Sequence, residues 1–174
     1  MVDINRLMYL LQYGSDNEIE QALIEFIKEV KENRNEERLR ILRRFFLGLL
    51  TEPKARIKIL ALRALAKVGL WDNEILETVY ELAKNDSRID VREAAEKALL
   101  ELLSNVEDRK SALRAVIKAI DKRKIRISPA DVVEAVGIDV AKDLHDNEDL
   151  NPSEKDLLDF AIKFVQEKFK EKEN

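Results

Sequence analysis

Two stretches of the chain carry the same pattern of apolar, basic and small residues 34 positions apart. They begin at Ile57 and Val91 and read IKILALRALAKVG and VREAAEKALLELL. The matching pairs are Ile57 and Val91, Lys58 and Arg92, Ala61 and Ala95, Ala64 and Ala98, and Leu65 and Leu99. The preceding segments match at the same offset, through Ile41 and Ile75, Leu42 and Leu76, Phe45 and Val79, Phe46 and Tyr80, and Glu52 and Asp86. A period of this length predicts two helices that repeat as one unit.

The repeated alanines indicate how these helices pack. Ala61 and Ala64 are three residues apart, as are Ala95 and Ala98, so each pair lies on one face of its helix. Because an alanine side chain is short, a neighbouring helix can approach to about 8 Å, the near end of the usual range of separations. The sequence therefore predicts close contacts between stacked helices.

Helices are expected along the whole chain, because apolar residues recur at intervals of three and four and the chain contains only four glycines and three prolines. The expected helices span residues 3–13, 16–33, 36–50, 53–68, 72–85, 88–104, 107–122, 129–143 and 152–171. Helix starts are marked by two capping-box patterns, Ser15 with Glu18 and Asn151 with Glu154, and by Ser128 before Pro129. The predicted fold class is all-α.

The combination of an acidic residue, a Val-Arg or Ile-Lys pair and spaced alanines, with a period in the thirties, resembles the HEAT repeats of the HEAT/armadillo superfamily. Residues 52–69 and 86–103 carry the resemblance, which is weaker in residues 3–33 and after residue 106. It implies a right-handed α–α superhelix whose second helices line a concave face, with hairpins at 3–33, 36–69, 72–104 and 107–143 in one domain, 1–174. It also implies that Lys58 and Arg92 pair with acidic residues of the same or an adjacent repeat. It implies no single activity.

The last expected helix, residues 152–171, carries a wide apolar stripe. The stripe consists of Leu158, Ile162, Val165 and Phe169, widened by Leu157, Ala161 and Phe164. A stack of helical hairpins exposes an apolar face at its last unit, so we expect this helix to cap the stack in a monomer. The alternative is that the stripe packs on a second copy and forms a homodimer.

Charge is distributed in blocks that the net charge of −4 conceals. Residues 38–67 contain nine basic residues and one acidic residue, and residues 109–126 contain eight and one, whereas the remaining blocks are acidic. One interpretation is that neighbouring repeats of opposite charge attract one another. The other is that the basic blocks bind an anionic partner such as nucleic acid, through counterion release.

Two sets of basic residues are the candidates for partner binding. Arg56, Arg63 and Lys67 lie away from the apolar face of their helix and should point into the concave side. Arg43, Arg44, Arg114, Lys118 and Lys122 form a second cluster that could hold an anionic partner.

Catalytic and metal-binding patterns are missing from the sequence. There is no cysteine, and the one histidine, His145, lies in an acidic connector that we expect to be a solvated loop. The glycines are scattered, so no phosphate-cradling loop is expected. We therefore expect no enzyme activity, no catalytic residue, no cofactor and no metal.

The remaining features predict a cytoplasmic protein that acts through binding. The apolar stretch after Arg6 is too short for a signal peptide or a membrane span, and the absence of cysteine fits a reducing compartment. High Lys, Glu and Ile content is typical of heat-adapted proteins. The sequence predicts a non-catalytic scaffold or protein-interaction module, with nucleic-acid binding as the alternative.

Overall fold

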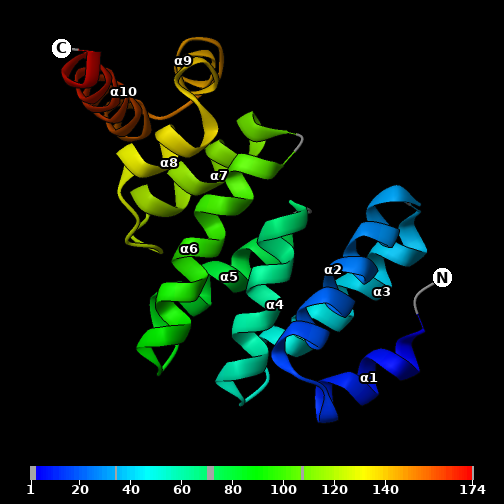
Figure 1. Ribbon diagram of the computed structural model, residues 1–174. Helices are drawn as coiled ribbons and strands as arrows, with labels where there is room; N and C mark the ends of the chain where they lie inside the picture. Colours follow the sequence, from blue (N-terminus) through cyan, green and yellow to red (C-terminus); the bar gives the residue numbers. More distant parts are fainter. Residues whose placement is uncertain (1–2, 34, 70–72, 107, 174) are drawn as a thin grey trace. The chain divides into compact units, whose positions relative to one another are not determined.

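The computed structural model describes residues 3–33, 35–69, 73–106 and 108–173, which contain ten α-helices and no strand (Figure 1). The prediction of an all-α fold is therefore confirmed. The helices are α1 (Ile4–Tyr13), α2 (Asp16–Glu32), α3 (Glu36–Leu50), α4 (Ala55–Val68), α5 (Asn73–Asn85), α6 (Ile89–Asn105), α7 (Arg109–Asp121), α8 (Pro129–Val136), α9 (Ile138–Asn147) and α10 (Pro152–Glu173). The chain forms two compact units, Met1–Asn105 and Val106–Asn174, and the grouping of all hairpins into one domain stays a prediction.

In the first unit α4 lies between α2 and α6 and packs on both (Figure 1). α3 packs on α4 and α5, α5 packs on α6, and α1 packs on α2. The second helices of three successive hairpins are thus neighbours, as the repeat predicts.

The repeated alanines lie in the contact region of these helices. Ala61, Ala64 and Ala95 are completely buried, and Ala98 is nearly so, in the two helices that pack most extensively on each other, α4 and α6. α4 ends at Gly69, whose φ of 74° is left-handed and whose missing Cβ would come within 2.5 Å of the Asn105 carbonyl oxygen. Only glycine allows both the turn and this close approach of α6.

The helix starts follow the sequence signals with one exception. At Ser15 both bonds of the capping box are formed: the hydroxyl accepts from the Glu18 N–H and the Glu18 carboxylate accepts from the Ser15 N–H. Asn151 accepts from the Glu154 N–H at 2.8 Å, but Glu154 is buried, and its Oε2 has no hydrogen-bond partner in the described chain. The Asn151 half of the second capping box is therefore formed, and Oε2 of Glu154 takes no part in it.

The second unit contains α7, α8, α9 and α10, and α10 packs on the other three. Part of its predicted stripe makes this contact, since Leu158, Ala161, Ile162 and Val165 are buried. Two further stripe residues, Phe164 and Phe169, remain exposed, as does Phe160 on the same helix. Whether α10 caps a longer stack or also joins two copies stays a prediction.

The prediction of one helix over residues 129–143 is wrong. α8 ends at Val136 and α9 begins at Ile138, because Gly137 adopts φ 103° and ψ 141°, a conformation that other residues rarely reach. α9 continues to Asn147, so His145 lies in the last turn of a helix and not in a loop, with its Nδ1 2.8 Å from the Asp146 carboxylate. Residues 72 and 107, where two of the predicted hairpins begin, lie outside the described residues.

None of the helices in the described ranges has the length and apolar character needed to cross a membrane.

Replacing Ala95 by leucine tests the close packing of α4 and α6. The added side chain has no room at a completely buried position, so we expect Ala95→Leu to lower the free energy of unfolding by about 1–3 kcal/mol. Lys97→Leu is the matched control, because Lys97 is exposed on the same helix. Denaturant melts that show equal stability for both variants would contradict the close helix contact.

Candidate functional site

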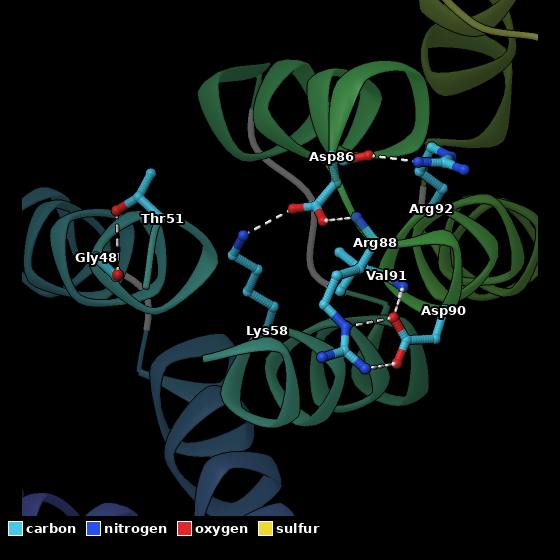
Figure 2. A network of polar contacts seen from close by, with 8 residues as sticks. All are labelled: Gly48, Thr51, Lys58, Asp86, Arg88, Asp90, Val91 and Arg92. Carbon is cyan, nitrogen blue, oxygen red and sulfur yellow. Dashed lines mark hydrogen bonds and ion pairs between the residues drawn. The ribbon is translucent and has the colours of Figure 1, made fainter. Parts of the chain in front are cut away.

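Asp86 joins three segments of the first unit, as Figure 2 shows. Its carboxylate accepts a hydrogen bond from Lys58 on α4 at 2.7 Å and another from the Arg88 N–H at 3.0 Å. The Arg92 guanidinium on α6 donates to the Asp86 carbonyl oxygen at 2.6 Å. The expected role of Lys58, an ion pair with the adjacent repeat, is confirmed, whereas Arg92 binds a backbone carbonyl in place of a carboxylate.

The surroundings of Asp86 favour its charged form. Burial alone would raise its pKa, but hydrogen bonds from Lys58 and the Arg88 N–H, together with the charges of Lys58 and Arg92, lower it below the usual value. The side chains of Lys58 and Asp86 are 16% and 5% exposed, so water screens this pair only weakly. Asp86 is therefore a structural anion that holds α4 against the start of α6.

Two of the three residues predicted to bind a partner on the concave side form ion pairs with α2 or its start. Arg56 pairs with Asp16 and also donates to the Gly14 carbonyl oxygen at 3.0 Å. Lys67 pairs with Glu20 at 2.7 Å, and the Glu20 side chain is 11% exposed. Arg63 is exposed and forms no ion pair within the described residues.

The second predicted cluster is divided between the two units. Arg43 and Arg44 lie on α3, where Arg43 is half-buried and Arg44 is exposed. Arg114 on α7 pairs with Glu148 at 3.7 Å and donates to the Asp149 carbonyl oxygen at 3.2 Å. Lys118 and Lys122, at the end of α7, are exposed. The sequence grouped these residues by charge alone, and the structure assigns them to separate packing units.

A hollow of about 490 Å³ lies between α1, α3 and the start of α4, and we call it the α1–α3 groove. Its lining combines apolar residues with three charged ones. The lining residues are Met8, Leu11 and Gln12 of α1, Arg44, Phe45, Gly48 and Leu49 of α3, and Glu52, Lys54 and Ile57. All of them belong to the first unit.

The groove coincides with a departure from the repeat. Ile75 and Val79 of α5 are 1% and 3% exposed, whereas their counterparts in α3 are less covered: Ile41 is 41% exposed and Phe45 is half-buried. On the same side of the helix, Gly48 stands where the next repeat has the buried Leu82. α3 thus presents an apolar face that its repeat partner α5 keeps covered.

Gly48 is exposed near the end of α3, and a Cβ built on it would meet nothing within 4 Å. Its carbonyl oxygen accepts from the Thr51 hydroxyl at 3.1 Å, a bond that closes the last turn (Figure 2). A glycine inside a helix costs about 1 kcal/mol relative to alanine. No contact among the described residues requires a glycine here, and the space where a side chain would lie is open.

A larger hollow, of about 720 Å³, lies between α1 and α2. Half of its lining residues are charged, namely Asp3, Arg6, Glu18, Glu25 and Glu29. Within the described part of the chain, no group of three His, Cys, Asp or Glu residues is placed to hold a metal ion.

Sequence reasoning missed the α1–α3 groove. The one available signal was the replacement of an apolar repeat position by Gly48, which is visible in the alignment of residues 48 and 82. The seating of α1 could not be inferred, because α1 is amphipathic and yet buries only Leu7.

Comparison of the chain with family models, with curated proteins and with solved structures found no match.

The lowered pKa of Asp86 predicts a pH-dependent contribution to stability. Because the carboxylate is more acidic in the folded state, its stabilising effect is complete above the unfolded pKa of about 4 and is lost as pH falls through the folded value. At pH 7 we expect Asp86→Asn to lower the free energy of unfolding by about 1–3 kcal/mol.

The difference between Asp86→Asn and the natural sequence should shrink as pH falls below about 4. Fluorescence of Trp71, the only tryptophan, provides the measurement during denaturant melts. A difference that stays constant from neutral to acidic pH would show that the charge of Asp86 does not stabilise the fold.

Proposed function

We propose that this protein is a non-catalytic protein-binding module of HEAT-like hairpins and that the α1–α3 groove is its binding surface. The observation that carries the proposal is the uncovered apolar face of α3, where Ile41 and Phe45 are more exposed than their repeat counterparts Ile75 and Val79. Concave apolar surfaces with charged edges are typical of sites that receive another polypeptide.

The lining of the groove supports binding and offers no means of catalysis. Met8, Leu11 and Phe45 give it apolar contact area, and Arg44, Glu52 and Lys54 give it charge. A nucleophile with an adjacent base would be needed for covalent chemistry, and the lining residues include none. The groove can contribute affinity through buried area and orientation through its charges.

The same proposal includes the finer architecture of the fold. The sequence of contacts α2–α4–α6, with α3 beside α5, is the arrangement that stacked HEAT-like hairpins require. The half-buried ion pair of Lys58 with Asp86 is consistent with the inter-repeat pairing that the resemblance implies. These contacts support a right-handed superhelix for the first unit, which remains part of the proposal.

Nucleic-acid binding is a second candidate because of four cations near the end of α7. Lys118, Lys122, Lys124 and Arg126 are exposed and form no ion pair within the described residues. They contrast with Arg114, whose charge is met by Glu148. Four such cations could neutralise phosphates, although no aromatic side chain accompanies them for base stacking in residues 118–126.

The main proposal predicts capture of a protein partner that depends on the groove. From extracts of cells that produce the protein, we expect stoichiometric capture that survives nuclease treatment. Met8→Asp should reduce the capture at least about tenfold, because Met8 is an exposed lining residue and the change places charge on the apolar surface of the groove.

Tyr13→Asp is the matched control for this experiment, since Tyr13 is an exposed apolar residue of α1 that does not line the groove. It should leave the capture unchanged. Equal capture by all three proteins, or no captured protein, would refute the α1–α3 groove as the binding surface.

The second candidate predicts binding of duplex DNA or RNA that depends strongly on salt. With four phosphate contacts, affinity should fall about a hundredfold between about 50 and 200 mM salt. Lys122→Glu with Arg126→Glu should abolish binding, whereas Lys142→Glu with Lys170→Glu, two exposed lysines elsewhere in the same unit, should not. Fluorescence anisotropy that detects no binding at low salt would eliminate this candidate.

A further inference from the structure

We infer that the occupant of the α1–α3 groove is an amphipathic α-helix of a partner protein whose polar flanks are acidic. The inference rests on the proposed function and adds the conformation and charge of the partner. Three features of the first unit lead to it: the repeat, Gly48 and the basic edge of the groove.

The repeat indicates that the occupant is a helix. In α5 the positions of Ile75 and Val79 are covered within a stack of helices, with α3 and α6 as neighbours. Of the equivalent positions of α3, Phe45 lines the groove, and Ile41 is exposed one helical turn before it. In α5 this face packs on a neighbouring helix, whereas in α3 the equivalent face is open. A helix is therefore the element whose ridges of side chains fit the open face of α3.

The length of this face sets the size of the occupant. Ile41 lies near the middle of α3, and the groove continues past its end to Lys54 and Ile57. From residue 41 to residue 52 a helix rises about 16 Å, which corresponds to about three turns of a bound helix. Apolar residues at positions i, i+3 or i+4, and i+7 of such a helix would lie along Phe45, Leu49 and Leu11.

Gly48 marks the place of closest approach. The Cβ position of this exposed glycine has nothing within 4 Å, so the space above Gly48 is open beside the lining residues Phe45 and Leu49. In the next repeat a leucine, Leu82, occupies this position and is buried. A large apolar side chain of the bound helix can enter the space above Gly48 and take the place that Leu82 takes in the other hairpin.

The charge at the edge of the groove selects acidic flanks. Arg44 and Lys54 line the groove, and Arg40 lies one helical turn before Arg44; all three are exposed and form no ion pair within the described residues. Glu52 is the only acidic lining residue. A helix with carboxylates beside its apolar face gains favourable pairing and faster association, whereas a basic helix is repelled.

A display library of helical peptides tests this inference directly. The peptides are about 16 residues long, with fixed apolar positions at i, i+3, i+4 and i+7 and flanking positions randomised among Glu, Gln, Ser and Lys. We expect selection on the full chain to enrich glutamate at the flanks. The best peptide should become helical on binding, as measured by circular dichroism.

Two variants show whether the selected peptide occupies the groove. Gly48→Leu places a leucine side chain above residue 48, as Leu82 does at the equivalent position of α5. It should weaken binding of the peptide at least about tenfold. It should not lower the Tm of the protein, because the added side chain has free space. Arg44→Glu with Lys54→Glu should weaken binding of the acidic peptide by a similar factor and should allow its lysine-flanked counterpart to bind. Lys97→Glu, a charge reversal of an exposed residue of α6 outside the groove, is the control and should change neither affinity.

The outcomes separate this inference from the proposed function. Three results would each overturn the acidic helix as occupant. They are enrichment of basic or neutral peptides, an absence of enrichment, and selected peptides whose affinity does not change with Gly48→Leu. If groove-dependent capture of a cellular protein still occurs, the binding function stands with a different kind of partner. If that capture also fails, the proposed function falls with the inference.

Discussion

The close packing of α4 between α2 and α6 is the constraint on which the first unit depends. Ala61, Ala64 and Ala95 are completely buried where the helices meet, so their backbones can approach closely, and Gly69 lets Asn105 approach the end of α4. Polar contacts then fix the position of each helix along the axis of its neighbour. Lys67 pairs with Glu20 on one side, Lys58 pairs with Asp86 on the other, and the Asn105 side chain donates to the Ala66 carbonyl oxygen at 3.0 Å. Small residues permit the approach, and the polar contacts define its register.

These contacts also explain why a strongly basic block is a poor guide to function in this chain. Three cations of α4, Arg56, Lys58 and Lys67, pair with acids of α2 or of the turn before α6. In the second unit Lys110 pairs with Asp143 and Glu148. Exposed pairs of this kind contribute little stability individually. Their effect is to favour one order of neighbours, which agrees with the interpretation that adjacent repeats of opposite charge attract. A cation that forms such a pair attracts an external anion less strongly. The cations near the end of α7 form no such pair within the described residues.

The sequence predicted most of the local structure and little of the candidate site. Helix positions follow from the spacing of apolar residues, and the buried alanines follow from the repeat, because both depend on neighbours within one or two hairpins. The break at Gly137 was missed, since a glycine permits a left-handed φ without requiring it. The unpaired Oε2 of Glu154 and the groove beside α1 depend on how whole helices are seated. Periodicity shows which face of α1 is apolar, but it does not show that only Leu7 would be buried.

The departure from the repeat is more informative than the repeat itself. In stacked hairpins, equivalent positions share one environment, so an apolar position that is buried in α5 and exposed in α3 indicates a missing neighbour. Leaving that face open has an energetic cost, because exposed apolar area forgoes about 25 cal/mol per Å² of burial and Gly48 costs about 1 kcal/mol in helix propensity. Neither cost improves the packing of the isolated chain. In the binding that we propose, both costs would be offset when a helix of the partner covers Ile41 and Phe45 and fills the space above Gly48.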